Sequence, residues 1–226
     1  MLINSARHQK PFTHLVTFPL VYADLKTKFL EFRKEVLKKC QDDRGVDDSL
    51  FQNANKLHLT IVTAVLICES EIEQAKNLFE DCQAKFNFNK KLKVNIRGLE
   101  YMNDDPSNVD VLYAQVRQTG QDSIQKIADS LMETFISSGL SKKQFDRVKL
   151  HATVMNSLLR QDPSGTTEPT SKSENKDRES FDARNILKYF GDFDFGWYDL
   201  EEIHLSLRFS SGHNGYYECV RKITLS

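Results

Sequence analysis

The tripeptide His-x-Thr occurs twice in this chain, each time in an aliphatic setting. The first copy lies in Leu57 to Ile61, Leu-His-Leu-Thr-Ile, and the second in Leu150 to Val154, Leu-His-Ala-Thr-Val. The two histidines are 93 positions apart (151 − 58). Successive side chains of a β-strand point to opposite faces, so each copy predicts a strand with a polar His/Thr face and an apolar core face. We expect two matched halves that bring their histidines to one shared site.

Paired histidines and threonines suit the cleavage of a phosphodiester. That reaction needs a base for the attacking oxygen, an acid for the leaving oxygen and donors for the non-bridging oxygens. Histidine can fill the first two roles near neutral pH, and a threonine hydroxyl can fill the third. No metal is required. The candidate catalytic residues are therefore His58, Thr60, His151 and Thr153.

Composition limits the other function classes. The 226 residues carry 31 basic and 32 acidic side chains, a net charge of −1, so no global field attracts nucleic acid or an anionic membrane. Any nucleic-acid contact must come from a local patch. The four cysteines form no C-x-x-C pair, and neither a signal peptide nor a long apolar run appears. These features favour a reducing intracellular compartment.

Hydrophobic periodicity predicts the element order β-α-β-α-β-β-α-β, then a short helix and closing strands. We expect Asp24 and Ser70 to cap the first two helices and Gly212 to Gly215 to form a tight hairpin turn. The expected strands are 12–20, 57–67, 91–99, 109–116, 147–158, 193–197, 202–209 and 216–225, and the helices lie around 25–37, 72–82, 122–137 and 181–190.

This order predicts an α+β fold with two pseudo-symmetric lobes. Each lobe is a small, mostly antiparallel sheet flanked by helices, and each supplies one His-x-Thr strand to a central cleft. Residues 12–226 form a single domain after an N-terminal tail, 1–11. Residues 160–180 contain no apolar side chain, so we expect a disordered insertion there, with a mobile lid as the alternative.

The paired motifs resemble those of the two-histidine phosphoesterases, whose defining feature is H-x-[ST] on strands of two pseudo-symmetric lobes. Within that superfamily, several stretches resemble the phosphoesterase-like domains of the activating signal cointegrator complex, and one resembles those of A-kinase anchoring proteins. The former are Phe18 to Leu20, Phe51 to Asn53, Glu100 to Pro106, Val148 to Asn156 and Glu179 to Asp182, and the latter is Asn214 to Cys219. The resemblance covers nearly the whole chain from Phe12 onward.

The resemblance implies a metal-independent domain that binds a nucleotide such as AMP, or RNA. A 2′,3′-cyclic phosphate or a 2′,5′-linked oligonucleotide is the expected substrate. It also implies a nuclear protein of a helicase-containing activating signal cointegrator complex, connected with transcriptional coactivation and alkylation-damage repair. Relatives often carry an RNA-binding KH domain, so one domain of a longer protein is expected. No cofactor and no membrane partner are implied. Two alternatives stay open, a module that binds nucleotides or RNA ends without turnover and an interaction scaffold with a vestigial cleft.

Further ligand-binding candidates come from placement relative to the motifs. Lys149 shares the face of His151, and His204 lies in a third polar strand face with Ser206. Phe18 and Tyr101 are aromatic candidates for stacking on a base, and the competing interpretation is that both lie in the core. For His204 the competing interpretation is a solvated strand face. The full set is Phe18, Tyr101, Lys149, Asn156 and His204.

Two weaker patterns compete with simpler interpretations. Lys91, Lys93 and Arg97 form a basic stripe that could track a phosphate backbone, beside Trp197 as a base-stacking candidate, but ordinary solvation of a strand face competes. A metal site built from the three histidines 58, 151 and 204 is disfavoured because the sequence offers no clustered ligand spacing. We therefore predict no metal ligands.

Overall fold

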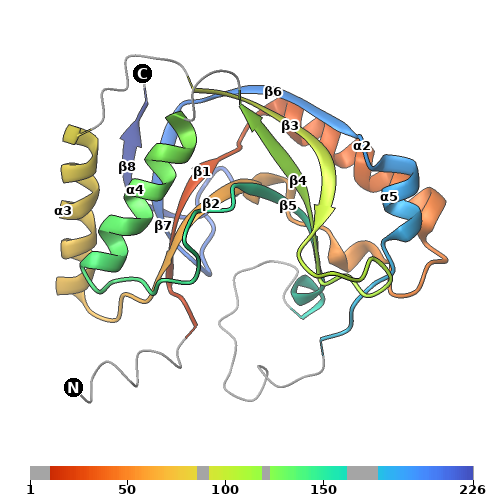
Figure 1. The fold of residues 1–226 in the computed structure, drawn as a ribbon, viewed down its shortest axis with the longest axis horizontal. Coiled ribbons are helices and arrows are strands. Elements are labelled where there is room, and N and C mark those ends of the chain that lie inside the picture. The colour runs from red at the N-terminus through yellow and green to blue at the C-terminus, as the bar shows by residue number, and fades with distance from the viewer. Residues whose placement is uncertain (1–10, 86–91, 119–122, 162–177, 226) are drawn as a thin grey trace.

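A computed structural model describes residues 11–85, 92–118, 123–161 and 178–225. In this part of the chain, eight strands form one antiparallel sheet in the order β6-β3-β4-β5-β2-β1-β7-β8 (Figure 1). The strands are β1 (His14–Pro19), β2 (His58–Ala64), β3 (Leu92–Tyr101), β4 (Val111–Gln118), β5 (His151–Asn156), β6 (Asp194–Leu200), β7 (Glu202–Leu207) and β8 (Cys219–Thr224).

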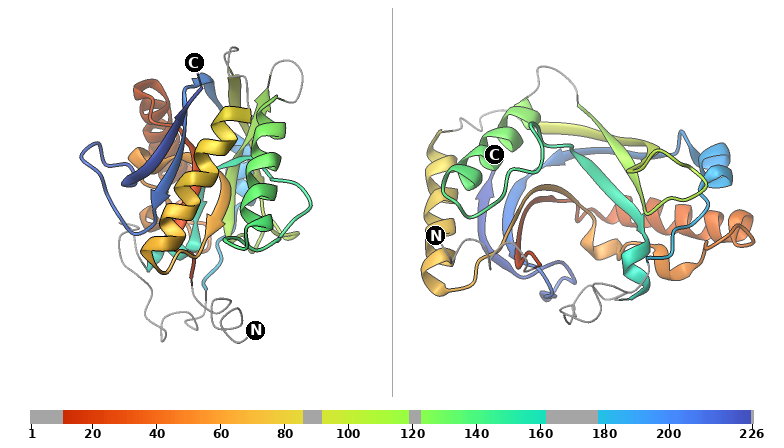
Figure 2. Two further views of the ribbon diagram at one scale, coloured as in Figure 1. Left: turned by 90° about the vertical axis from the view of Figure 1, so that its left-hand side faces the viewer. Right: turned by 60° about the horizontal axis from the view of Figure 1, so that its bottom comes forward.

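Helices pack against both halves of this sheet. Helices α3 and α4 contact the half that contains β8 and β2, whereas α2 and α5 contact β6 and β3 (Figures 1 and 2). The helices are α2 (Ala23–Cys40), α3 (Glu69–Lys85), α4 (Ser123–Ser137) and α5 (Arg184–Phe190), with 3-10 helices η1 (Asp48–Leu50), η2 (Ala54–Lys56) and η3 (Ser157–Arg160). The predicted α+β fold class is confirmed.

The two predicted sheets are two halves of one continuous sheet. One half is β6-β3-β4-β5 and the other is β2-β1-β7-β8, and they meet where β2 pairs with β5 through a single residue pair, Leu59↔Ala152. Each half therefore presents its His-x-Thr strand at its inner edge. The junction between the two halves is the place where the two motifs meet.

The apolar faces of both motif strands enter the core as predicted. Leu57, Leu59, Ala152 and Val154 are buried. A fully buried leucine side chain contributes about 1.5–3 kcal/mol to folding, so exposing this face would cost far more than exposing the polar one. The hydrophobic effect thus fixes which way the histidines and threonines point.

Several predicted element ends were wrong. Helix α2 starts after Tyr22, with Asp24 inside its first turn. Helix α3 starts at Glu69, so Ser70 lies inside its first turn and is not its cap. The Glu71 carboxylate accepts the Ile67 N–H at 2.8 Å. Strand β2 ends at Ala64, and Ile67 is 49% exposed rather than buried.

The closing hairpin is longer than the Asn-Gly signal predicts. A turn does occur there, where the Gly212 N–H donates to the Tyr216 carbonyl at 2.7 Å, but residues 208–218 form a loop between β7 and β8. The reason is the buried ring of Tyr216, whose hydroxyl lies 2.8 Å from Thr17 Oγ1 on β1. The loop is thus held down on the sheet.

Both ends of the predicted insertion are anchored by arginines. Arg160 contacts Asp47 and the carbonyl of Gly45, and Arg178 Nε donates to Ser157 Oγ at 2.7 Å. Residues 162–177, which hold the rest of the predicted insertion or lid, lie outside the described residues, as do residues 1–10 of the tail.

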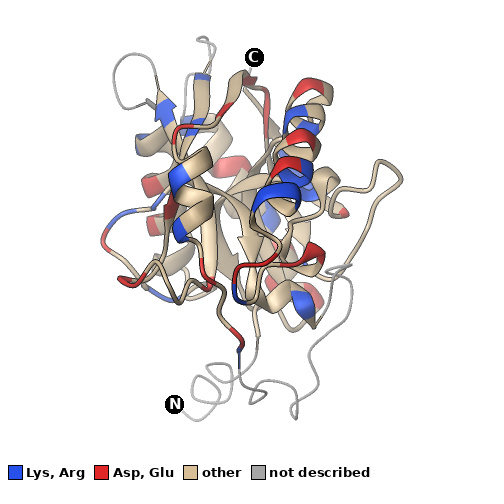
Figure 3. Ribbon diagram, turned by 90° about the vertical axis from the view of Figure 1, so that its right-hand side faces the viewer, with Lys and Arg blue, Asp and Glu red and all other residues tan. Residues whose placement is uncertain are grey.

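Charge is distributed as the composition predicts. On the face shown in Figure 3, seen from the side of α2 and α5, basic and acidic segments are interspersed along the helices. Within the described ranges, no helix combines the length and apolar character needed to cross a membrane.

Candidate functional site

The register between the two motif strands builds a compact polar array. Because Leu59 pairs with Ala152 in antiparallel register, His58 lies opposite Thr153 and Thr60 lies opposite His151. Directly opposite Cβ atoms on paired strands are about 4.5–5.5 Å apart and diagonal neighbours about 7–8 Å. The two imidazoles therefore lie on one diagonal and the two hydroxyls on the other. A phosphate group placed over the centre would have one imidazole on each side.

Both imidazoles are held in the same orientation and tautomer. His58 Nδ1 lies 2.7 Å from the carbonyl oxygen of Lys56, and His151 Nδ1 lies 2.6 Å from that of Lys149. A carbonyl oxygen only accepts, so Nδ1 carries the proton in each ring and donates it. Nε2 is then the atom that meets a ligand, as a base when the ring is neutral and as a donor when it is charged.

The lowered pKa values of His58 and His151 favour neutral rings. Burial lowers the pKa of His58 to about 4, with the charge of His151 adding to the effect. Burial also lowers the pKa of His151 from its usual 6.5, and the Lys149 ammonium adds to that lowering. A bound phosphate would oppose both shifts, because a nearby anion stabilises the imidazolium form.

Each motif extends to a lysine and a tyrosine. Lys56-Leu57-His58 and Lys149-Leu150-His151 repeat the same Lys-Leu-His order. Lys56 Nζ lies 4.9 Å from the ring centroid of Tyr217, and Lys149 Nζ lies 4.7 Å from that of Tyr113. We define the first half-site as residues 56–60 with Tyr217, and the second half-site as residues 149–153 with Tyr113.

Both tyrosines meet the histidine of their half-site edge to face. The ring centroids of His58 and Tyr217 are 5.7 Å apart, and those of His151 and Tyr113 are 5.1 Å apart. Such aromatic contacts restrict the rotation of the imidazole. The Lys–Tyr–His grouping thus occurs once in each half of the sheet.

In the second half-site, Tyr113 is tied to an acidic residue of β3. Its hydroxyl donates to Glu100 Oε2 at 2.7 Å, and Gln115 Nε2 donates to Glu100 Oε1 at 2.5 Å. Burial and the adjoining carboxylate raise the pKa of Tyr113, so it remains a neutral donor. Glu100 thereby fixes the two side chains of β4 that lie opposite Thr153 and His151.

In the first half-site, Tyr217 comes from the β7–β8 loop. Gly215 has φ +80°, and a Cβ there would lie 2.7 Å from Asn55 Nδ2. Asn55 belongs to η2, immediately before the first motif. Only glycine allows the loop to approach η2 this closely in that conformation.

Two sequence-predicted ligand residues lie on the wrong face. Phe18 pairs with Leu59 and is 0% exposed in the core, opposite to the His58 face. Tyr101 pairs with Leu112 and packs against the core, while its neighbour Glu100 takes the motif face beside Tyr113. The predicted ligand roles of Phe18 and Tyr101 are therefore corrected to packing roles.

The other three candidates have distinct positions. Lys149 adjoins His151, as its contact with Tyr113 shows. Asn156 caps η3, and its Oδ1 accepts from Leu158 N–H and from Arg178. His204 lies on β7 opposite Thr17, beyond β1 and β2 from the second motif, and its Nε2 lies 2.6 Å from Glu202 Oε2. Lys149 joins the motif residues, whereas His204 belongs to a neighbouring group.

The described residues of the basic stripe lie on β3, next to edge strand β6. Trp197 is 48% exposed on β6 with Lys93 Nζ 6.0 Å from its ring, and Arg97 pairs with Asp194. Lys91 lies outside the described residues. Among the residues that the structure describes, no three His, Cys, Asp or Glu side chains converge as metal ligands would.

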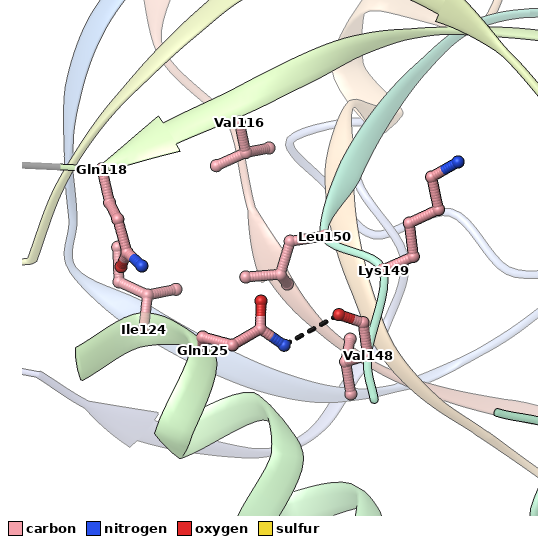
Figure 4. Close-up of a pocket in the computed structure, with 7 residues that line it drawn as sticks. All are labelled: Val116, Gln118, Ile124, Gln125, Val148, Lys149 and Leu150. Carbon is pink, nitrogen blue, oxygen red and sulfur yellow. Dashed lines mark hydrogen bonds between the residues drawn. The ribbon is translucent and has the colours of Figure 1, made fainter. Parts of the chain in front are cut away.

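A cavity of about 290 Å³ lies behind the second motif, between the start of β5 and the start of α4 (Figure 4). Gln125 Nε2 donates to the Val148 carbonyl at 2.8 Å along its wall. Figure 4 shows the Lys149 side chain directed away from Leu150 and Gln125. This cavity therefore adjoins the apolar side of the strand and is separate from the histidines.

Sequence reasoning missed Lys56, Glu100, Tyr113 and Tyr217. The repeated lysine two positions before each histidine was a readable signal for Lys56, and the alternation of β4 placed Tyr113 on a definite face. Tyr217 gave no such signal, because a loop residue has no periodicity that reports its neighbours.

Comparison with known proteins agrees with this geometry. The family model described as "AKAP7 2'5' RNA ligase-like domain" matches residues 12–225. The mouse protein "Activating signal cointegrator 1 complex subunit 1" is 45% identical over 227 residues, covering 96% of this chain. The chain spans 64% of the length of that relative.

Solved structures share the fold at low sequence identity. The Thermus thermophilus protein TT0787 has a TM-score of 0.58 at 13% identity, covering 94% of this chain and 97% of that one. A crystal structure titled as a phosphoesterase has a TM-score of 0.56 at 14% identity, covering 96% and 99%. E. coli LigT complexed with 3'-AMP has a TM-score of 0.54 at 15% identity, covering 96% and 99%. With the paired His-x-Thr strands and the match over residues 12–225, the chain belongs to the AKAP7 2'5' RNA ligase-like domain family of two-histidine phosphoesterases.

Proposed function

We propose that this domain binds a nucleotide or RNA phosphodiester between its two half-sites and hydrolyses it with two histidines. The observation that carries the proposal is the Leu59↔Ala152 register, which sets His58 against Thr153 and Thr60 against His151. A 2′,3′-cyclic phosphate or a 2′,5′-linked oligonucleotide is the proposed substrate. The LigT structure with 3'-AMP supports a nucleotide ligand for this fold.

In the proposed reaction, neutral His58 acts as the base and charged His151 as the acid. For a cyclic phosphate, His58 Nε2 takes a proton from water while the water oxygen bonds to phosphorus. For a 2′,5′-linked oligonucleotide, the neighbouring 3′-hydroxyl takes the place of water. His151 Nε2–H gives its proton to the ribose oxygen whose bond to phosphorus breaks. The hydroxyls of Thr60 and Thr153 donate to the non-bridging oxygens. The low pKa of His58 favours it as the base.

We also propose, from the 45% identical mouse relative, that the protein works in the nucleus within an activating signal cointegrator complex. A role in transcriptional coactivation and alkylation-damage repair is part of this proposal. It can be tested by affinity purification of the tagged protein followed by mass spectrometry. Recovery of no other complex subunit would contradict it.

The enzymatic proposal is tested with cyclic-phosphate and 2′,5′-linked substrates in the presence of chelator. His58→Ala and His151→Ala should each lower turnover by about 10²–10⁴-fold, the usual contribution of a general acid or base. His14→Gln, which changes a buried histidine of β1, is the control and should retain turnover if its thermal midpoint is unchanged. Turnover that survives both alanine variants, or that chelator abolishes, contradicts the mechanism. Nucleotide binding without turnover, lost in the same variants, would instead identify a recognition module.

A further inference from the structure

A second cavity, of about 540 Å³, adjoins the first half-site. We call it the Tyr217 cavity, because Tyr217 both lines it and meets the edge of His58. The volume lies in the range of small-molecule sites. Its lining residues are Glu202, His204, His213, Asn214, Tyr216, Tyr217, Cys219, Val220, Arg221 and Lys222.

Strand register places this cavity on the same face of the sheet as the motifs. Thr60 on β2 pairs with Thr17 on β1, Thr17 pairs with His204 on β7, and His204 pairs with Lys222 on β8. Laterally paired residues share a face, so all four side chains point to the motif side. Three strand spacings of about 4.8 Å put Lys222 roughly 14 Å from Thr60 along this row.

The far end of the Tyr217 cavity carries an exposed, ion-paired lysine. Lys222 Nζ lies 2.6 Å from Glu202 Oε1, and the other oxygen of Glu202 lies 2.6 Å from His204 Nε2. The Lys222 side chain is 55% exposed, so a ligand in the cavity can contact its ammonium group. Arg221 also lines the cavity, but its guanidinium forms an ion pair with Glu80 of α3.

The near end of the cavity is aromatic. Tyr216 and Tyr217 pack edge to face with centroids 5.2 Å apart, and Tyr216 is buried against Thr17. Aromatic side chains beside a phosphate site are the usual platform for a nucleobase, since every base offers a π-face. The cavity thus runs from an aromatic wall at His58 to a cation at β8.

From this arrangement we propose that the Tyr217 cavity binds the adjoining nucleoside and a second phosphate of an oligonucleotide. The scissile phosphate lies between His58 and His151, the nucleoside lies beside Tyr216 and Tyr217, and Lys222 meets the second phosphate. The inference rests on the proposed function of the two half-sites and narrows its substrate class. The domain prefers a ligand with at least two phosphates over a mononucleotide or a cyclic monophosphate.

The test measures the affinity gained by adding one phosphate. The probes are 2′,5′-linked diadenylates in which a methoxy group replaces the hydroxyl that attacks phosphorus, so that internal cleavage is blocked. There are three such probes. One carries no terminal phosphate, one carries a 5′-phosphate and one carries a 3′-phosphate. In calorimetry at low salt, one phosphorylated probe should bind the parent about fivefold tighter than the unphosphorylated probe.

Three variants separate the cavity from the rest of the surface. Lys222→Gln should remove the gain, and Glu202→Gln, which takes a negative charge from the cavity, should increase it. Lys143→Gln is the matched control, since it removes an exposed lysine that pairs with Asp146 outside the cavity and should keep the gain. Thermal midpoints check that all three fold as the parent does.

The outcomes distinguish this inference from the function it rests on. Equal affinity of the parent for all three probes overturns it, as does an unchanged gain in Lys222→Gln. If that happens while His58→Ala still weakens every probe, the phosphodiester site stands and the second-phosphate pocket does not. If no probe binds the parent, the proposed function fails and this inference fails with it.

Discussion

The two half-sites have the same reactive groups but different supports. In the second half-site, Tyr113 lies on strand β4 directly beside β5, and its hydroxyl is bonded to Glu100. In the first, Tyr217 comes from the β7–β8 loop. Lys56 is 2% exposed, whereas Lys149 is exposed. The histidines and threonines, which would touch a phosphate, are equivalent in the two half-sites. The lysines and tyrosines around them differ in burial and in the element that supplies them.

This difference separates the features that the proposed chemistry requires from those that only support them. Each half supplies a histidine fixed through Nδ1, a threonine, a lysine and an aromatic edge. A loop and a strand can each deliver the tyrosine. The first half-site, whose tyrosine comes from a loop, also adjoins the Tyr217 cavity. We therefore expect ligand specificity to depend on the first half-site and the rigidity of the phosphate site to depend on the second.

Removing either threonine hydroxyl should have the largest effect on turnover among the changes that test whether the two half-sites are equivalent. Thr60→Val and Thr153→Val should each lower turnover about 30-fold, since a hydrogen bond to a charged oxygen contributes about 2 kcal/mol. Thr63→Val, on the same strand as Thr60 but paired with Leu15, is the control and should have little effect. Steady-state kinetics measure all three. A loss confined to one motif threonine would mean that the half-sites are not equivalent.

The next effect concerns the loop that supports the first half-site. Gly215→Ala should destabilise the protein by about 2 kcal/mol, combining the strain of a left-handed backbone with the clash against Asn55. Gly139→Ala has nearly the same φ, +79°, but no atom within 4 Å of the added Cβ, so it should cost about 1 kcal/mol. Urea unfolding compares them. Only Gly215→Ala should also weaken phosphate binding. Equal losses in both variants would show that the contact with η2 is unimportant.

The two lysines should separate stability from binding. Lys56→Gln should cost about 1–2 kcal/mol of stability because its side chain is buried, while Lys149→Gln should change stability by less than about 0.5 kcal/mol. Lys149→Gln should still weaken phosphate binding a few-fold. Unfolding curves and phosphate titrations provide both readouts. Equal changes in unfolding free energy and in phosphate affinity for the two variants would contradict the different roles assigned to the buried and the exposed lysine.

The remaining prediction concerns the pH dependence of stability. The pKa of His58 is about 4 when folded and near 6.5 when unfolded, so the unfolded chain binds more protons between those values. Stability should therefore fall as pH drops from 6.5 toward 4 and be insensitive to this group above 6.5. His58→Gln should flatten that slope in urea unfolding at several pH values. A slope that is the same in the parent and the variant would contradict the assigned burial of His58.

The faces of the motif residues were easier to predict from the sequence than the elements around them. Strict alternation and burial fix the faces of His58, Thr60, His151 and Thr153, so their convergence needed only the pairing of two strands. Faces beyond a β-bulge were harder to predict. Strand β3 changes register between Ile96 and Leu99, around Gly98 at φ +84°. That shift puts Glu100 on the motif face and Tyr101 on the core face, which no regular period could predict.

Other failures came from tertiary contacts with no local signal. The Asn-Gly turn was present, but Tyr216 folds the surrounding loop onto β1 through its bond to Thr17. This long-range contact, across 199 positions of sequence, brings Tyr217 to His58. Sequence periodicity reports which residues are buried within an element, and it does not report which loop covers them.

The most direct test of the central claim is a crystal structure with the methoxy-blocked dinucleotide bound. The account predicts one phosphate with Nε2 of both His58 and His151 about 2.7–3.2 Å from its oxygens, and the hydroxyls of Thr60 and Thr153 donating to the remaining two. A phosphate that contacts one histidine only, or that lies away from both, would contradict it.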